Sequence, residues 1–225
     1  MAKRGVVIVA GGSGSRMRSS LPKQFMILGD KPVVAHTINT FAQALPNADI
    51  VVVLPEEHIA LWRNLSARFE VAPHRCVAGG KERFDSVKCG LDALSDDVEY
   101  VAIHDGVRAM VSKRLIIRAM LEVEQHDAVI PVVDAVDSYR VVEGDDSKVI
   151  SRSLLRIVQT PQVFRRSVLR EAYEQPYNTS FTDDATVVEG LGTKITLIEG
   201  ERSNIKLTTP EDMEWAEWYM HRLNQ

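Results

Sequence analysis

The sequence predicts a doubly wound α/β fold built around a mostly parallel sheet. Short, continuously apolar runs recur along the chain, beginning at residues 6–9, and segments with helical spacing of apolar residues separate them. The first such segment places Val34, Ile38, Phe41 and Leu45 on one face of a helix. Strands that are apolar throughout are typical of parallel sheets covered by helices on both faces.

The remaining elements follow the same two patterns. Further strands are expected at residues 50–54, 100–103, 128–133 and 194–198. Further helices are expected at residues 56–69, 82–94, 115–123 and 165–173, in a short segment after Thr182, and from Pro210 onward. For the last helix Thr209 is the expected N-cap, and Asp212 would lie near the positive end of the helix dipole.

The pattern changes between residues 134 and 151. Polar and apolar residues alternate there on both sides of Glu143-Gly144-Asp145-Asp146, which predicts a β-hairpin standing away from the sheet as an arm. No internal repeat, linker or low-complexity segment interrupts the rest of the chain. Residues 1–225 are therefore predicted to form a single domain, with an arm at about 134–151.

Composition narrows the classes of function. Hydrophobic residues make up 45% of the chain, and 27 Lys and Arg oppose 31 Asp and Glu, for a net charge of −4. This balance argues against a partner that is nucleic acid or an anionic membrane surface. Cys76 and Cys89 form no C-x-x-C pair, which indicates a reducing compartment. Without a signal peptide or an apolar run near ~18 residues, the expected location is cytoplasmic.

The first apolar run leads into AGGSGSRMRSSLPKQF, a glycine turn rich in cations. Glycines let the backbone approach a phosphate closely. Gly12 and Gly14 match the start of G-x-G-x-x-G, but Met17 occupies the third glycine position, and no Walker A ending is present. Arg16 and Lys23 beside this turn suit a polyphosphate whose bridging bond is to be broken. The simpler alternative is a tight turn with exposed cations.

Two later segments point to the same edge of the sheet. AGGKERFDSV is a second glycine turn that opens a helix, with Ser86 in its first turns. IHDGVR ends the strand at 100–103, so Asp105 is expected at the carboxyl edge, where open α/β sheets bind ligands. An N-cap or turn role for Asp105 is the alternative. His104-Asp105 is also a pair found in metal phosphohydrolases, but no partner histidine has a useful spacing.

Six motifs occur in an order typical of the cytidylyltransferases: AGGSGSRM…LPKQF, GGKERFDSV, HDGVR, RSLLRIVQTPQVF, TDDAT and NIKLTTPEDM. Over nearly its whole length the chain most resembles the 2-C-methyl-D-erythritol 4-phosphate cytidylyltransferase family of the non-mevalonate isoprenoid pathway. The resemblance implies the nucleotide-diphospho-sugar transferase fold, which is a Rossmann-like, mostly parallel sheet with helices on both faces and a protruding β-hairpin arm.

The resemblance also implies an activity. Members of this family transfer CMP from CTP to methylerythritol 4-phosphate, release pyrophosphate and form 4-diphosphocytidyl-2-C-methyl-D-erythritol, with Mg²⁺ or another divalent cation as cofactor. The expected partners are therefore CTP and a polyol phosphate. A homodimer joined through the arm is expected as well.

The resemblance assigns roles to individual residues. Arg16 and Lys23 match the basic pair that stabilises the transition state. Asp105 matches an acidic residue near the sugar and the metal, where it would hold the metal directly or act through the triphosphate. The residues implied to bind the nucleotide are Ala10, Gly11, Gly12, Gly14, Gly80 and Ser86. Those implied to position the substrates are Asp105, Arg108, Ser138, Arg152, Thr160 and Lys206.

Three features depart from the family pattern, and three other functions compete with it. Gly106 and Ala109 replace the usual alanine and proline, Lys81 stands where an acidic residue is common, and the approach to the arm is longer. A ribitol 5-phosphate cytidylyltransferase shares the AGGxGxRM motif. A catalytically silent nucleotide-binding module is the second alternative. A dinucleotide-dependent oxidoreductase is the third, and Met17 disfavours it.

Overall fold

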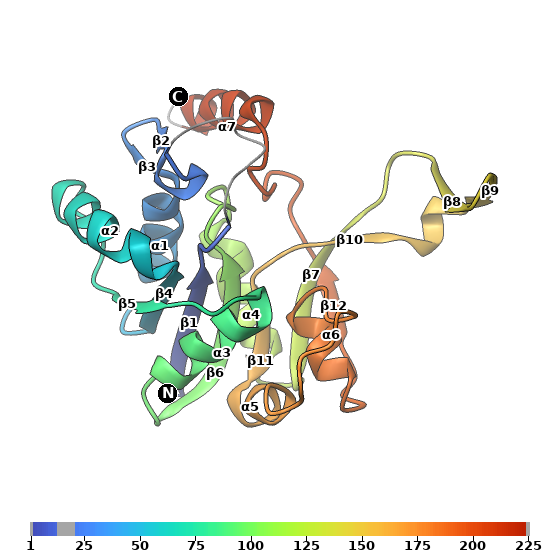
Figure 1. The fold of residues 1–225 in the computed structure, drawn as a ribbon, viewed down its shortest axis with the longest axis horizontal. Coiled ribbons are helices and arrows are strands. Elements are labelled where there is room, and N and C mark those ends of the chain that lie inside the picture. The colour runs from blue at the N-terminus through green and yellow to red at the C-terminus, as the bar shows by residue number, and fades with distance from the viewer. Residues whose placement is uncertain (1, 13–20, 224–225) are drawn as a thin grey trace.

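The computed structural model describes residues 2–12 and 21–223 (Figure 1). Its main sheet has eight strands, in the order β10-β7-β11-β6-β1-β4-β5, and β12 pairs with β7 off this path. These strands are β1 (Lys3–Val9), β4 (Asp49–Leu54), β5 (Arg75–Ala78), β6 (Val98–Asp105), β7 (Ala128–Asp134), β10 (Arg156–Val158), β11 (Gln162–Arg165) and β12 (Thr196–Glu199). Two separate strand pairs are β2 (Ile27–Leu28) with β3 (Lys31–Pro32), and β8 (Tyr139–Glu143) with β9 (Asp146–Ile150).

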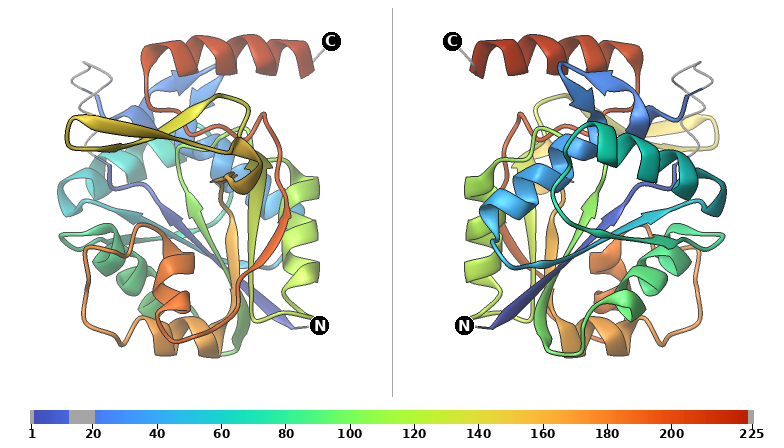
Figure 2. Two further views of the ribbon diagram at one scale, coloured as in Figure 1. Left: turned by 90° about the vertical axis from the view of Figure 1, so that its right-hand side faces the viewer. Right: turned by 90° about the vertical axis from the view of Figure 1, so that its left-hand side faces the viewer.

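Helices cover both faces of the sheet, as Figure 2 shows. They are α1 (Val33–Ala44), α2 (Glu56–Arg68), α3 (Arg83–Ala93), α4 (Lys113–Glu122), α5 (Arg166–Ala172), α6 (Asp184–Glu189) and α7 (Pro210–Leu223), with single 3-10 turns η2 (Lys23–Phe25) and η3 (Arg152–Leu154). Side chains of α1, α2 and α4 pack in one apolar cluster. Side chains of α3, α5 and α6 pack in a second cluster. The predicted doubly wound architecture is therefore confirmed.

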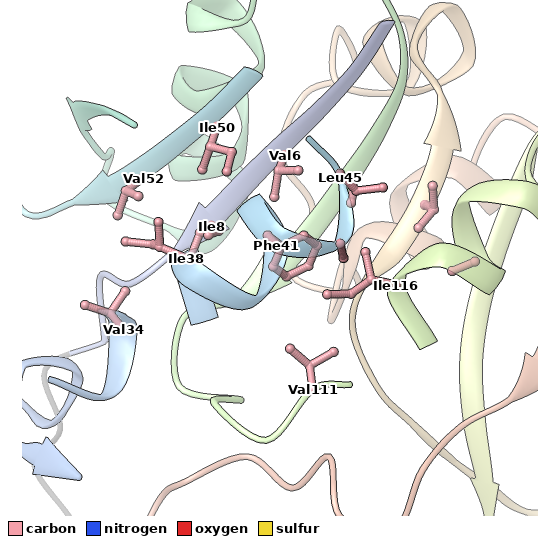
Figure 3. Close-up of a cluster of buried hydrophobic side chains, with 14 of the residues drawn as sticks. Val6, Ile8, Val34, Ile38, Phe41, Leu45, Ile50, Val52, Val111 and Ile116 are labelled. Carbon is pink, nitrogen blue, oxygen red and sulfur yellow. The ribbon is translucent and has the colours of Figure 1, made fainter. Parts of the chain in front are cut away.

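The burial of β1 explains why its sequence is apolar without alternation. Successive side chains of a strand point to opposite faces. Val6 and Ile8 point toward α1, where Phe41 packs (Figure 3), whereas Val7 lies in the cluster formed with α3. All four side chains are fully buried, and burial of each stabilises the fold by roughly 1.5–3 kcal/mol. Side chains on both faces of β1 are therefore packed against helices.

The sheet is mixed at the β7 side. Pairing is parallel between β1 and its neighbours β4 and β6, between β4 and β5, and between β12 and β7. Strand β11 lies antiparallel between β6 and β7, and β10 is antiparallel to β7. The sequence prediction lacked β5, β10 and β11, which have only three or four residues each. The helix expected from Arg165 begins one residue later, since Arg165 ends β11.

The predicted arm is present and extends from the body of the molecule (Figure 1). Strands β8 and β9 pair in antiparallel register from Tyr139↔Ile150 to Glu143↔Asp146. Between them Gly144 has a φ of +63°, a backbone conformation that glycine adopts without strain. Val142 and Val149 of the arm are 71% and 73% exposed. The arm therefore presents apolar side chains that its own chain does not cover.

Helix α7 lies against the β2–β3 hairpin at the carboxyl end of the sheet (Figure 1). Its N-terminus has the predicted cap: the amide of Asp212 donates to Thr209 Oγ1 over 3.3 Å, and the amide of Thr209 donates to Asp212 Oδ2 over 2.9 Å. Within the described residues, no helix has the length and apolar character needed to cross a membrane.

Candidate functional site

A cavity of about 370 Å³ opens at the carboxyl ends of β1, β4 and β6. In open α/β sheets this edge is where ligands bind, because the loops that follow the strands converge there. The lining residues come from five segments: Val9, Ala10, Gly11, Gly12, Lys23 and Gln24 at and after the end of β1, Pro55 after β4, Gly79 to Arg83 with Ser86 at α3, Asp105 and Val107 at the end of β6, and Lys206 and Thr208 before α7. The sequence prediction placed most of its candidates on these segments.

The second glycine turn brings the N-terminus of α3 to the cavity. A Cβ atom on Gly80 would lie 2.3 Å from Cβ of Asp85, so only glycine fits this position. Ser86 donates from Oγ to the carbonyl of Glu82 over 3.0 Å, and its residue also lines the cavity. At the first turn of α3 a capping box joins Glu82 and Asp85, and the amide of Glu82 donates to Asp85 Oδ2 over 3.0 Å. This wall of the cavity is therefore suited to a polar base edge.

The start of the first glycine turn, from Ala10 to Gly12, also lines the cavity. Gln24 is fully buried in η2 and donates from Nε2 to the carbonyl of Ala10 over 2.8 Å. This bond ties η2 to the end of β1 and brings Lys23 to the cavity. Of the residues predicted to bind nucleotide, Ala10, Gly11, Gly12, Gly80 and Ser86 therefore meet in one cavity. Gly14 and the predicted catalytic residue Arg16 lie outside the described residues.

Asp105 ends β6 at the floor of the cavity, among three cations. Lys206 Nζ lies 2.9 Å from Asp105 Oδ2, Arg108 Nε lies 3.6 Å from the same oxygen, and Arg83 Nη2 lies 3.7 Å from Oδ1. Burial alone would raise the pKa of Asp105, but the positive charges of Arg83, Lys206 and Arg108 outweigh it and hold the pKa below its usual range. Asp105 is therefore an ionised carboxylate at neutral pH.

Thr160 supports Asp105 from beneath. Its Oγ1 accepts the amide N–H of Asp105 over 3.1 Å and donates to Nδ1 of His104 over 2.9 Å. His104 is fully buried, and burial lowers its pKa to about 3, so the imidazole stays neutral. Thr160 was predicted to position substrate, and what it holds in the structure is the backbone of Asp105.

Two predicted substrate residues lie away from the cavity of their own chain. Ser138 and Arg152 are exposed at the base of the arm, and neither lines the cavity. Arg152 donates from Nη1 to the carbonyl of Val136 over 2.6 Å, so it fixes the entry of the arm. Their role in substrate binding stays a prediction. Arg108 contacts Asp105 and donates to the carbonyl of Asn204 over 2.8 Å, which ties the segment before Lys206 to β6.

Sequence reasoning missed the ion pair that flanks Asp105. Arg83 and Asp184 form a bidentate pair with both N–O distances at 2.8 Å, and Tyr173 donates from Oη to Asp184 Oδ1 over 2.6 Å. The two charged residues lie in the motifs GGKERFDSV and TDDAT, so the motifs were noticed but the pairing was not. No local spacing links residues so far apart in the chain.

Close packing explains why a glycine, and not the usual alanine, occupies position 106. A Cβ atom on Gly106 would lie 2.9 Å from Cβ of Ala10 and 3.3 Å from side-chain atoms of Ile8 and Val34. The turn after β6 therefore packs directly on the turn after β1, and a larger residue would push the two apart. Lys81 lines the cavity at its exposed rim.

Comparisons with known proteins agree on one family. A sequence model of the family described as "IspD: 2-C-methyl-D-erythritol 4-phosphate cytidylyltransferase" matches residues 5–222. A 2-C-methyl-D-erythritol 4-phosphate cytidylyltransferase from Bacteroides fragilis is 46% identical over 215 residues, covering 95% of this chain and 97% of that protein.

Solved structures extend the similarity to the fold. The crystal structure of 4-diphosphocytidyl-2C-methyl-D-erythritol synthase from Anaerococcus prevotii matches with a TM-score of 0.83 at 27% identity, covering 98% of this chain and 99% of that one. The 2-C-methyl-D-erythritol 4-phosphate cytidylyltransferase of Thermus thermophilus matches with a TM-score of 0.76 at 28% identity, covering 98% and 100%. The similarity thus spans both glycine turns, the arm and the segment around Lys206.

Proposed function

The chain belongs to the 2-C-methyl-D-erythritol 4-phosphate cytidylyltransferase family, and we propose that the cavity around Asp105 is where its reaction takes place. The enzyme transfers CMP from CTP to 2-C-methyl-D-erythritol 4-phosphate and releases pyrophosphate. The observation that carries the site is the meeting, in one cavity, of two glycine turns, Lys23 and the ionised Asp105. The family match favours methylerythritol phosphate over ribitol 5-phosphate as the acceptor.

The chemistry needs cations more than it needs a base. A phosphate monoester that attacks a triphosphate brings two anions together, and two unit charges ~4 Å apart repel by about 4 kcal/mol at an effective dielectric constant of ~20. The attacking phosphate oxygen is already ionised, so no side chain has to remove a proton from it. Catalysis then consists of holding the reactants in line and balancing the charge that develops.

We assign the charge-balancing role to Lys23 and Arg16, on the segment that follows the first glycine turn. Lys23 lines the cavity, and the buried Gln24 fixes the segment that carries it. Lys206 lines the same cavity and is 44% exposed, so its ammonium is accessible to a substrate phosphate. Gly80 and Ser86, on the α3 wall, are the residues we assign to the cytosine.

Magnesium is proposed as the cofactor, with Asp105 as the residue that would hold it. Mg²⁺ is commonly bound through one or two carboxylates together with substrate phosphates. Asp105 fits this pattern, because it is ionised and lines the cavity. Among the described residues no group of three or more His, Cys, Asp or Glu could hold a metal alone, so triphosphate oxygens would complete its shell. The metal would supply further neutralisation of the triphosphate charge.

We also propose a homodimer in which the arm of one chain reaches the cavity of the other. Two observations support it: the exposed valines of the arm, and the position of Ser138 and Arg152 outside their own cavity. A cytoplasmic location is proposed as well, and the free thiols of Cys76 and Cys89 support it.

The decisive experiment measures pyrophosphate release by the purified protein with CTP and Mg²⁺. Methylerythritol 4-phosphate and ribitol 5-phosphate are compared as acceptors, and CTP alone is the blank. Strong release with methylerythritol 4-phosphate is expected. Preference for ribitol 5-phosphate would overturn the acceptor, and CTP binding without release would indicate a silent nucleotide-binding module.

A further inference from the structure

The cavity wall contains an arginine that is shared unequally between two carboxylates. Arg83 makes two bonds of 2.8 Å to Asp184, but its Nη2 stays 3.7 Å from Oδ1 of Asp105. The second distance is longer than an N–H···O bond of ~3 Å. Arg83 therefore attracts Asp105 electrostatically without occupying that oxygen.

The partner carboxylate is built to keep Arg83 in this place. Asp184 is fully buried at the start of α6, and a buried carboxylate needs a cation and hydrogen bonds. Tyr173 supplies a further hydrogen bond of 2.6 Å to Oδ1, and its ring stacks on Phe84 with centroids 4.7 Å apart. Burial disfavours the charge on Arg83, but Asp184 and Asp105 outweigh it and raise the pKa of the guanidinium. Arg83 therefore stays charged, and two hydrogen bonds hold its guanidinium on Asp184.

We propose that Asp184 is a positioning residue for nucleotide binding: with Tyr173 it holds Arg83 beside Asp105, so that Oδ1 of Asp105 stays open to the Mg²⁺–nucleotide complex. This inference rests on the proposed function of the cavity. If Asp184 lost its charge, Arg83 would turn to the remaining carboxylate and form a direct ion pair with Asp105. That ion pair would compete with the Mg²⁺–nucleotide complex for the same oxygen.

The test compares Asp184→Asn with the wild type under the pyrophosphate assay. We expect the KM for CTP to rise about tenfold, the lower end of the range for groups that orient a metal-binding residue, here Asp105. The KM for the sugar phosphate should stay within about twofold, because Lys206, which we assign to the substrate phosphate, contacts the other oxygen of Asp105. A purely structural role would instead lower the melting temperature and the kcat while leaving the KM for CTP unchanged.

A second variant keeps the test informative if Asp184→Asn folds poorly. Tyr173→Phe removes only the hydroxyl and keeps the ring on Phe84, so it should raise the KM for CTP in the same direction but less. The matched control is Asp49→Asn, which breaks another close Arg–Asp pair, with Arg75 at 2.6 Å, away from the cavity. Its KM for CTP should equal that of the wild type.

A double-mutant cycle decides whether Asp184 acts through Arg83. In an Arg83→Gln background no guanidinium remains to cover Asp105, so Asp184→Asn should cause no further rise in the KM for CTP. Equal effects of Asp184→Asn in both backgrounds would overturn the proposal, as would an unchanged KM in a folded Asp184→Asn protein.

Calorimetric titration with CTP separates this proposal from the proposed function. If the wild-type protein releases no pyrophosphate, the proposed function is contradicted. The dissociation constant for CTP, in contrast, tests the positioning role whether or not turnover occurs. A tenfold weaker binding by Asp184→Asn is expected, and binding equal to that of the wild type would overturn the role of Asp184.

Discussion

The hydroxyl of Thr160 and Nδ1 of His104 lie 2.9 Å apart, and both residues are buried beneath the cavity. The same hydroxyl accepts the amide N–H of Asp105. One oxygen thus joins the end of β6 to the segment between β10 and β11. The position of the Asp105 carboxylate depends on this joint, because a carboxylate follows the backbone that carries it.

Replacing Thr160 with valine should weaken both the fold and the reaction. Valine has a similar shape but no hydroxyl, so the amide of Asp105 and Nδ1 of His104 lose their partner. Leaving buried polar groups unpaired costs about 1–3 kcal/mol in the free energy of unfolding. Urea denaturation measures this loss, and steady-state kinetics should show a lower kcat. Thr160→Ser keeps the hydroxyl and should resemble the wild type, and an equally damaged serine variant would contradict the explanation.

The free energy of unfolding should fall as the pH is lowered, and His104 contributes to this fall over a defined pH range. Burial lowers the pKa of His104 to about 3, whereas an unfolded histidine binds a proton near pH ~6.5. Below that pH the unfolded chain gains a proton that the folded chain does not, so this group removes about 1.4 kcal/mol per pH unit. Asp105, whose pKa is lowered from 3.8, adds its own loss only at lower pH.

Denaturation curves between pH 7 and pH 4 test this prediction. His104→Asn should flatten the slope, because asparagine offers a similar acceptor to Thr160 without taking up a proton. His36 and His74 have lowered pKa values through burial as well, so a residual slope is expected. The exposed His126→Asn is the control, and a His104 variant with the control's slope would refute the assignment.

Removing the ammonium of Lys23 should slow turnover by roughly 10²–10³, the scale of a lost charge-stabilising group. Lys23 lines the cavity, so Lys23→Ala is measured by pyrophosphate release at saturating CTP. Arg16→Ala is expected to behave in the same way. The exposed Lys113, at the start of α4, gives a lysine-to-alanine control outside the cavity. A loss under about tenfold with an intact fold would remove Lys23 from the catalytic group.

The arm prediction concerns Arg152. Arg152→Ala should raise the KM for the sugar phosphate more than the KM for CTP, because the guanidinium is assigned to the substrate phosphate. If the arm serves the cavity of the partner, Arg152→Ala and Lys23→Ala proteins should recover activity when they are mixed, at a sugar-phosphate concentration low enough that each variant alone has little activity. Random exchange yields one intact site in each mixed dimer, or about a quarter of the wild-type sites. Mass spectrometry confirms that the subunits have exchanged. If activity still does not recover after exchange, the arm does not act on the cavity of the partner chain.

Most of the fold could be predicted from the sequence because its strands are long enough to reveal a pattern. The buried run in β1 and the face of α1 formed by Val34, Ile38 and Phe41 are examples. Strands β5, β10 and β11 escaped prediction because they are short and each begins or ends with an arginine, so they contain no run of apolar residues longer than three. Their position depends on neighbours distant in the chain, such as β6 for β11.

The residues of the site could be predicted where the local sequence explains their role. They could not be predicted where their role depends on a contact with a residue distant in the chain. The glycine turn at Gly80 and the carboxylate at Asp105 could be identified from local sequence and strand ends. The pairing of Arg83 with Asp184 could not, because it requires α6 to pack beside α3. The hidden support of Asp105 by Thr160 likewise depends on β11 lying next to β6.

The position of β11 also governs the order in which the protein can be completed during synthesis. Strand β11 lies between β6 and β7 but leaves the ribosome after both of them and after the arm. Until residue 165 has emerged, β6 and β7 have no strand between them, and unpaired strand edges invite association with other chains. Lys206 emerges later still, so a nascent chain cannot assemble the pocket around Asp105 until synthesis is nearly finished.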